Sequence, residues 1–447
     1  MRVTGPDHNQ NWPMPGASSG DLAAFTTGAH VVDLAAWLDQ LPKPEAQRHL
    51  ANLPLVRRAK VFANMTLEVQ ADLAGSIPPS DLAAIVTQMD SDDRADLFKC
   101  LGPELRRNLM RDLAKDDQDD ISRLASYAEE SAGAIMTTDY AVIGANMTAR
   151  EAIAELRRQA PEKETIYRSY VLDARRRLIG SIRLHALVLA ADTTPIIQIM
   201  DDAPISVSLD TDREVVAGMI ARYDLLALPV VDADGELVGI VTHDDAADAM
   251  QAEMTEDFQK ISTVLPFTQS MREAGIGVLY SKRIVWLALL VFGNLFSGAG
   301  IAYFEETILA YVSLVFFLPL LIDSSGNAGS QSATLMVRAL ATGDVALKDW
   351  RNLIVRELAV AAALGATMAI VVLPVGAMRG GPEIALVVGL TMFLVVIVGS
   401  LVGMSLPFLL SRLRLDPATA SGPLVTTISD GVGVIVYFSI ASYVLHL

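Results

Sequence analysis

The sequence predicts a multi-domain membrane protein: an all-α helical solenoid, a duplicated α/β unit, a long connecting helix and an all-α transmembrane domain with five spans. Length is the first indication, because 447 residues at ~150 residues per domain predict about three domains. Charge is the second: from Ser281 onward nine basic residues balance nine acidic ones, so the whole net charge of -17 lies in residues 1–280. Only 19% of residues are charged, against about 25% in soluble domains. The first 280 residues are therefore expected to be acidic and water-soluble, and the rest of the chain is hydrophobic.

Composition also excludes several classes of function. The one cysteine, Cys100, excludes an intramolecular disulfide and a thiolate metal cluster, and its helical context favours a small buried apolar residue. An acidic surface repels phosphate, so no nucleic-acid partner is expected. Residues 1–30 are polar and rich in Pro, Gly and Ser, without the apolar core of a cleaved signal peptide. They are predicted to be a disordered tail.

The helical N domain is predicted over residues 31–131. Apolar residues recur there at spacings of three and four, which is typical of amphipathic helices. Capping signals recur about every 11 or 12 residues, with N-caps expected at Ser80 and Ser91 and a first helical turn at Pro103. A stack of short helices is the expected result.

Residues 132–242 contain an internal duplication. Ile135-Met136 reappears as Ile199-Met200, and Val171-Leu172-Asp173 with Gly180 reappears as Val230-Val231-Asp232 with Gly239. Each half reads as a helix, a β-rich run that ends in Gly, and a second helix. Asp234-Gly235 is a hairpin signal between paired strands. Two such halves are expected to pack together, each burying the face that the other leaves open.

A connecting helix follows in residues 243–272, and the transmembrane domain is predicted over 280–447. Five apolar stretches are long enough to cross ~30 Å of hydrocarbon: Ile284–Tyr303, Ile308–Val337, Leu358–Met378, Ile384–Leu410 and Ala418–Leu445. Lys and Arg gather in the loops before the first, after the second and after the fourth stretch, so these loops are expected to be cytoplasmic. The N-terminus is then cytoplasmic and the C-terminus outside. The second stretch is expected to break at Pro319 and at the polar run that begins at Asp323.

Asp430 is the most informative residue, because its span carries no Lys or Arg to pair with it. It is interpreted as a cation site in an aqueous path, since the surrounding Gly, Pro and Thr residues permit broken helix and exposed carbonyls. The alternative is a protonated Asp that is hydrogen-bonded to a neighbouring helix. Asp323, Asn327 and Gln331 form a second polar group in the second span, where they either line the cation path or only hold helices together.

A third group of candidate residues consists of Asp and Glu side chains in residues 1–280. Carboxylates at spacings of three and four share one helix face, and unit charges ~4 Å apart repel by about 4 kcal/mol at an effective dielectric of 20. A hard divalent cation with oxygen ligands would relieve this repulsion. A solvated surface is the better interpretation for any single residue. The candidates are Asp92, Asp93, Asp96, Asp210, Asp212, Glu214, Asp224, Asp244, Asp245, Asp248, Glu253, Glu256 and Asp257.

These parts resemble the MgtE family of magnesium channels. The duplicated unit resembles a pair of CBS domains, and the runs GNAGSQSATLMVRALATGD (326–344) and DPATASGPLVTTISDGVGVIVYF (416–438) resemble the family's membrane motifs. The resemblance covers nearly the whole chain after residue ~31. It implies a homodimer in the membrane lipid, with a pore on the two-fold axis, in a bacterial inner membrane.

The resemblance also assigns residues to Mg²⁺. Asp430 matches the pore aspartate, with Thr426 through its carbonyl and Gly422 at the entry as further contacts. A regulatory set matches Asp92, Asp93, Asp96, Gly133, Glu214, Asp224, Asp245, Asp248, Glu253, Glu256 and Asp257. ATP binding is reported for the family, but the pattern of a hydroxyl residue and an Asp three places on is kept only at Thr242 and Asp245. Arg183 and Ala186 replace it in the first half, which counts against ATP here.

The sequence is therefore interpreted as a non-enzymatic, Mg²⁺-selective channel that cytosolic Mg²⁺ closes, with Mg²⁺ as both cargo and regulator. A membrane-anchored CBS sensor without transport is the competing class, and a mere anchor has no use for Asp430. A carrier of Co²⁺ or Mn²⁺ stays open, because oxygen ligands also accept these ions.

Overall fold

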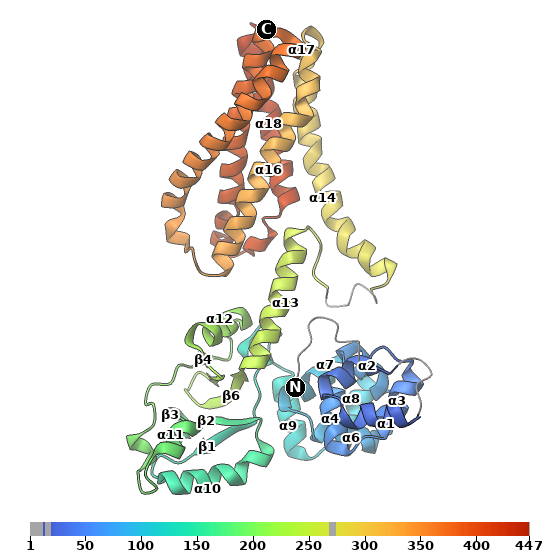
Figure 1. Cartoon of the computed structure of the whole chain (residues 1–447), viewed down its shortest axis with the longest axis vertical. Coiled ribbons are helices and arrows are strands. Elements are labelled where there is room, and N and C mark those ends of the chain that lie inside the picture. Colours follow the sequence, from blue (N-terminus) through green and yellow to red (C-terminus); the bar gives the residue numbers. More distant parts are fainter. Residues whose placement is uncertain (1–11, 14–18, 268–273, 447) are drawn as a thin grey trace. The chain divides into compact units, whose positions relative to one another are not determined.

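The computed structural model describes residues 12–13, 19–267 and 274–446 (Figure 1). The chain forms two compact units, residues 1–250 and residues 251–447, and each is described by itself. The first contains the helical N domain and two small sheets. The second contains the long apolar helices.

The N domain is a succession of short helices around one core. Its helices are α2 Val31–Leu38, α3 Lys43–Ala51, α4 Leu55–Ala63, α5 Leu67–Ala74, α6 Pro79–Thr87, α7 Ser91–Cys100, α8 Pro103–Asp112 and α9 Lys115–Leu124. Contacts between α2 and α4, α4 and α6, α5 and α7, and α6 and α8 give the repeating stack that the spacing predicts. Pro103 occupies the first turn of α8, as expected.

Three local predictions for this domain were wrong. Residues 19–28, placed in a disordered tail, form helix α1 (Ser19–Gly28), because Leu22 and Phe25 pack on the core and Phe25 meets Trp37 edge-on at 5.5 Å. Residues 1–11 and 14–18 of that tail lie outside the described residues. Ser80 and Ser91 lie inside α6 and α7, whose N-caps are Pro78 and Asp90. Cys100 is exposed, since it is the last residue of α7 and its side chain turns away from the core.

The duplicated region forms two equivalent three-stranded sheets. β1 (Tyr140–Ile143) pairs in parallel with β2 (Thr165–Leu172), which pairs antiparallel with β3 (Leu178–Arg183). β4 (Val207–Ser208), β5 (Ala227–Val231) and β6 (Leu237–Thr242) repeat this order. The helices are α10 (Ala149–Gln159), α11 (Leu184–Leu189) and α12 (Arg213–Tyr223), and α13 (His243–Ile261) follows β6. Gly235 turns the last hairpin at φ +80°, as the Asp-Gly signal predicts.

The two halves exchange their repeated Met residues. Met136, which precedes the first sheet, packs on Gly239 in β6, and Met200, which precedes the second sheet, packs on Gly180 in β3. A Cβ at either glycine would lie 2.6 Å from the Met sulfur. Thr137 also pairs with Ile240, and Asp201 pairs with Ser181. Each half therefore completes the other, and the glycines recur because the Met side chains need their space.

The second unit is a group of long helices. They are α14 Ile276–Tyr303, α15 Glu305–Ala310, α16 Ser313–Ala341, α17 Trp350–Arg412 and α18 Gly422–Val444, with single turns η5 (Leu347–Asp349) and η6 (Pro417–Thr419). Gly381 interrupts α17 with φ 82° and ψ -177° just before Pro382, so this element is two helices joined at a sharp bend. Among the described residues, Ile276–Tyr303, Leu347–Arg412 and Gly422–Val444 are long and apolar enough to cross a membrane.

Glycines bring α16 and α17 into close contact. A Cβ at Gly399 would lie 2.2 Å from the carbonyl oxygen of Ser325, and one at Gly403 would lie 2.0 Å from that of Gly329. Close backbone approach through small residues is the usual way to pack helices in a membrane. The predicted break of the second span is wrong: α16 continues through Pro319 and the polar run, and the span starts at Ser313, after α15.

Candidate functional site

A cleft of about 590 Å³ in the second unit is lined by α14, α16 and α18. Three residues predicted for the pore, Gly422, Thr426 and Asp430, lie on it at successive turns of α18. Ser330 of α16 stands beside them: its Oγ donates to the Gly422 carbonyl at 3.3 Å and lies 3.3 Å from Thr426 Oγ1. The cleft is thus walled by hydroxyl, carbonyl and carboxylate oxygens on one side.

Asp430 is half-buried, and its Oδ1 atom is buried without a hydrogen-bond partner among the described residues. A buried carboxylate oxygen without a partner is costly, so this atom requires water or a cation. The predicted broken helix around it is wrong, because α18 is continuous from Gly422 to Val444. Thr426 and Thr427 donate their hydroxyls back to the carbonyls of Gly422 and Pro423 at 2.9 Å, which holds this first turn together.

The second polar group divides into two faces of α16. Gly326 and Gly329 are buried against α18 and α17, where a Cβ would lie 2.8 Å from Thr426 Cγ2 and 2.7 Å from the Gly399 carbonyl oxygen. Asp323, Asn327 and Gln331 are exposed at successive turns of the other face. Asn327 donates to Asp323 at 3.0 Å. Helix packing therefore rests on the glycines and leaves the amides and the carboxylate free to face water or a second chain.

An acidic cluster forms in the first unit where α7, the α10–β2 loop and the start of α13 meet. Carboxylate oxygens of Glu164, Asp244 and Asp245 lie within 4.8 Å of one another. Asp92 and Asp93 lie in the first turn of α7, and the charge of Asp245 acts on both. Asp92 Oδ1 and Glu164 Oε2 are buried without a hydrogen-bond partner among the described residues. Buried oxygen ligands on several elements are the donor set that Mg²⁺ prefers.

Two contacts hold α7 against the α/β pair and so bring these acids together. Ser91 Oγ lies 3.0 Å from Thr137 Oγ1 and accepts a hydrogen bond from the Thr138 amide at 2.8 Å. The buried Arg94 guanidinium lies 2.8 Å from Asp117 and 3.5 Å from Asp139. Ala95 packs into the core of the second half. The Ser91 hydroxyl thus joins two domains instead of capping its helix.

Burial and mutual repulsion raise the pKa values of Asp92, Asp93, Glu164 and Asp245 in this cluster. The pKa of Asp93 rises to about 7, mainly through burial and then through the charges of Asp90 and Asp245. Burial also raises the pKa of Glu164 to about 8 and of Asp245 to about 6. For Asp92 the pKa lies well above its usual range, again through burial first and then through its acidic neighbours. A cation that binds here must displace these protons.

The remaining predicted regulatory residues of this unit lie outside the cluster or at its edge. Asp96 pairs with Lys99 at 3.0 Å one turn further along α7, and the exposed Asp248 acts on Asp245 only through its charge. Gly133 is buried in the turn η2 (Ala132–Ala134). Glu214 and Asp224 stand at opposite ends of α12, ~15 Å apart at 1.5 Å per residue, so one site within a single chain does not include both.

A second acidic group lies in the other unit, at the end of α13. Lys260 Nζ lies 2.7 Å from Glu256 and 2.5 Å from Asp416. Burial, and then the charge of Asp416, raise the pKa of Asp257 to about 6. Glu253 also contributes its charge to Asp257. Of the predicted residues, Glu253, Glu256 and Asp257 therefore meet at the base of the apolar helices.

Glu164 and Asp416 were not predicted as site residues. Glu164 lies in the loop before β2, and its amide donates to the Asp139 carbonyl. Asp139 follows Thr137, which pairs with Ile240 of the second sheet, and this pairing places Glu164 near the second half. Asp244 was a candidate among the acidic side chains of residues 1–280 but was not in the regulatory set that the resemblance implies. No sequence motif marks Glu164; only the topology brings it to Asp245.

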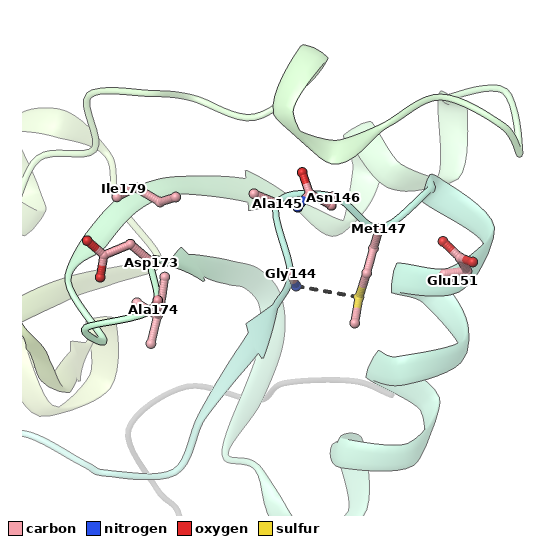
Figure 2. A pocket seen from close by; sticks show the side chains of 9 residues that line it. Gly144, Ala145, Asn146, Met147, Glu151, Asp173, Ala174 and Ile179 are labelled. Carbon is pink, nitrogen blue, oxygen red and sulfur yellow. Dashed lines mark hydrogen bonds between the residues drawn. The ribbon is translucent and has the colours of Figure 1, made fainter.

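A further pocket of about 810 Å³ lies at the ends of β1 and β2 in the first half (Figure 2). Its lining includes Glu151 and Asp173, and none of the nine described residues that line it is Lys or Arg. Hydrogen bonds from Thr148 and Arg177 lower the pKa of Glu151 and Asp173, respectively, so both carboxyls are charged. This chemistry repels a nucleotide phosphate. Arg183 is the last residue of β3, and Ala186 lies in α11, which follows it.

Comparison with known proteins identifies the class first. Residues 318–440 match a family model described as a divalent cation transporter, MgtE, residues 29–130 match the MgtE intracellular N domain, and residues 132–192 and 196–252 match CBS domains. The fold and the oxygen-lined sites thus define a membrane transporter of divalent cations with a CBS-domain pair.

The chain belongs to the MgtE family. The magnesium transporter MgtE of Thermus thermophilus is 38% identical over 420 residues, with 93% of each chain covered. That of Bacillus subtilis is 31% identical over 415 residues, 93% of this chain and 92% of that protein. A crystal structure of the cytosolic domain of the Mg²⁺ channel MgtE in complex with ATP matches 52% of this chain and 95% of that one, at 36% identity and a TM-score of 0.50.

Proposed function

We propose that this protein is a Mg²⁺ channel that imports the ion down its electrochemical gradient and that has no catalytic activity. The observation that carries the proposal is the Asp430 carboxylate, with a buried oxygen that lacks a partner among the described residues, in a cleft of an apolar helix group. A mere anchor does not explain this acid, because a carboxylate at membrane depth is tolerated only where it is hydrated or neutralised. The names of the relatives support Mg²⁺ as the ion.

The proposed arrangement in the membrane has five spans: α14, α16, the two halves of α17 on either side of Gly381, and α18. The basic loops then lie in the cytoplasm, which places the N-terminus inside and the C-terminus outside a bacterial inner membrane. A homodimer would bring the Asp430 clefts of two chains to one pore. The domain limits 31–131, 132–242, 243–272 and 280–447 are part of the same proposal, and residues 268–272 lie outside the described part of the chain.

In the proposed gating, cytosolic Mg²⁺ binds to the acidic cluster of the first unit. At high cytosolic Mg²⁺, ions bridge Asp92, Asp93, Glu164 and Asp245 and hold α7 on the CBS pair; when Mg²⁺ falls, carboxylate repulsion separates them. Moving a gate from 1:99 to 99:1 takes ~5.5 kcal/mol of differential binding, which several weak sites supply together. Helix α13 carries the change, because its first turn holds Asp245 and its last holds Lys260.

ATP is not part of the mechanism that we propose. A solved relative contains ATP, but here the hydroxyl–Asp pattern survives only as Thr242 and Asp245. Their side chains are hydrogen-bonded to each other. The neighbouring acids disfavour a triphosphate there.

Mg²⁺ uptake into Mg²⁺-starved cells tests this function. Asp430→Asn and Asp430→Ala are expected to abolish uptake, whereas Asp344→Asn, an exposed acid between α16 and α17, is expected to leave it unchanged. If wild type and all three variants take up no more Mg²⁺ than cells without the protein, the protein is a membrane-anchored sensor; wild-type uptake by the two Asp430 variants would overturn the role of Asp430. The same assay with Co²⁺ and Mn²⁺ distinguishes a carrier of another divalent cation.

A further inference from the structure

Helix α14 turns one face towards the segment of α18 that carries Asp430. Leu287, Leu290, Val291 and Asn294 line the same cleft as Asp430, at helical spacings of three and four. One turn beyond Asn294, Ser297 faces Gly431: a Cβ at Gly431 would lie 3.6 Å from Ser297 Oγ. This face is therefore apolar over two turns and becomes polar where it reaches the level of Asp430.

Neither of the two polar side chains on this face of α14, Asn294 and Ser297, has a hydrogen-bond partner in the part of the chain that the structure describes. Ser297 Oγ is buried without a hydrogen-bond partner among the described residues. Asn294 is exposed, in the interior of a 28-residue helix that is otherwise apolar around it. An amide exposed to hydrocarbon costs several kcal/mol, so a lipid-facing position is strongly disfavoured.

The contact between α14 and α18 is close and specific. A Cβ at Gly293 would lie 2.4 Å from Thr427 Cγ2, and one at Gly300 would lie 3.1 Å from Val434 Cγ1. Glycine at these two positions, which flank Asn294 and Ser297 in the sequence, lets α14 approach α18 closely. Asn294 and Ser297 are thus held beside the 426–431 segment by backbone packing, as Figure 1 shows for the two helices.

We propose that α14 forms a second wall of the cation path, in which the Asn294 amide, supported by Ser297, hydrogen-bonds to the water shell of the ion that passes Asp430. This inference rests on the proposed channel function. An amide supplies both a donor and an acceptor, and so orders water around a hydrated cation without adding charge. Asn294 is then a positioning residue for the hydrated ion, and Asp430 is its electrostatic site.

Thiol accessibility tests the proposal independently of transport. In a full-length Cys100→Ser background, Asn294→Cys is expected to react with a charged, water-soluble methanethiosulfonate reagent, and Mg²⁺ is expected to slow the reaction. The matched control is Leu295→Cys, which lies at the same depth but outside the cleft lining and is expected not to react. An unreactive Asn294→Cys would show a dry interface and would overturn the proposal.

Uptake gives the second readout. Asn294→Leu is expected to lower Mg²⁺ uptake by up to about tenfold, the effect of one lost hydrogen bond to the water shell of the ion, while Asn294→Gln keeps most of it. Gly298→Ala, on the same helix with open space around it, is the control for insertion. Normal uptake by Asn294→Leu would contradict the inference even if Asp430→Asn abolishes uptake, whereas active Asp430→Asn would overturn the channel function itself.

Discussion

Lys260 Nζ lies 2.5 Å from Asp416 Oδ2 and 2.7 Å from Glu256 Oε1, so a single ammonium joins the end of α13 to the turn that precedes α18. Asp416 also accepts a hydrogen bond from the Ala418 amide at 2.8 Å and so caps η6. Burial opposes the charge of Lys260, but the two carboxylates outweigh it and raise the pKa of the ammonium. Next to it, Ile261 packs on a cluster that contains Val337 and Ala418. The connecting helix is thus fixed to the chain that leads directly into the helix of Asp430.

Reversing this charge should loosen the gate. Lys260→Glu places a third carboxylate beside Glu256 and Asp416, so closure is expected to need about fivefold more Mg²⁺, corresponding to about 1 kcal/mol for a partly exposed ion pair. Uptake measured against cytosolic Mg²⁺ checks this. The double variant Lys260→Glu with Asp416→Lys should recover much of the wild-type response, and Lys348→Glu, in the turn η5, should not change it. Identical curves for Lys260→Glu and wild type would count against the coupling.

Mg²⁺ binding to the acidic cluster should release protons. We call the state in which α7 packs on the CBS pair the docked state. A carboxyl whose pKa is raised in this state stabilises it below the ordinary pKa, and this contribution is lost as the pH rises through the raised value. For Asp245, Asp93 and Glu164 this window runs from about 4 to about 8. Docking without Mg²⁺ should therefore weaken over this range, and Mg²⁺ should bind more tightly at pH 8 than at pH 6.

Calorimetry of the full chain in buffers of different ionisation enthalpy measures the released protons. Release should fall steadily as the pH rises from 6 to above 8, because Asp245, Asp93 and Glu164 lose their protons in turn before the metal binds. Glu164→Gln should reduce it, whereas Glu68→Gln, which changes an exposed acid of α5 outside the cluster, should not. Proton release that does not change with pH would show that the cluster carboxyls are ionised before the metal binds.

Helix periodicity, the duplication and the apolar runs were sufficient to predict the order and type of the domains, because each is a local pattern. The exchange of Met136 and Met200 between the two halves was not predicted, since the repeat shows which residues correspond but not which sheet each one packs on. Glu164 was missed for this reason: its approach to Asp245 depends on the exchanged segments. The same limit explains Ser91, whose hydroxyl reads as a helix cap but reaches another domain.

For the membrane part, the sequence assigned Asp430, Thr426 and Gly422 to one pore only through its resemblance to the MgtE family, and the structure brings all three to one cleft at successive turns of α18. The sequence did not predict that α16 and α18 are unbroken. Hydroxyls that return to the carbonyls of the preceding turn, such as Thr426 to Gly422, satisfy the backbone without a break. The role of Asn294 was not predicted either, because it lies in an uncharged stretch of sequence. Only the folded structure shows that it lines the same cleft as Asp430.

Removing the buried Arg94 should release α7 from the CBS pair. Its guanidinium balances Asp117 and Asp139, and Arg94→Ala would leave Asp117 without this cation and Asp139 with Lys163, at 3.5 Å, in place of two cations. Breaking such a pair costs about 3 kcal/mol, a value at the lower end because the partners are partly exposed. Hydrogen exchange of the α7 amides in the full chain should speed up by about a hundredfold. Arg111→Ala, an exposed residue of α8, is the control, and equal protection in both variants would refute this role for Arg94.

The close contact of α16 and α17 should tolerate no added side chain. A Cβ at Gly399 would lie 2.2 Å from the Ser325 carbonyl oxygen, a backbone atom that cannot rotate away, and Ser325 also donates its hydroxyl to the Val395 carbonyl at 2.8 Å. Gly399→Ala must therefore push the two helices apart, which widens the contact that supports Ser330 and the Asp430 cleft. We expect loss of the folded chain from detergent extracts, or a thermal unfolding midpoint lowered by several degrees, as for an overpacked core. Gly433→Ala, on α18 with nothing within 4 Å of its Cβ, is the matched control and should behave as wild type. If Gly399→Ala unfolds at the wild-type temperature and transports normally, the two helices do not meet at these glycines.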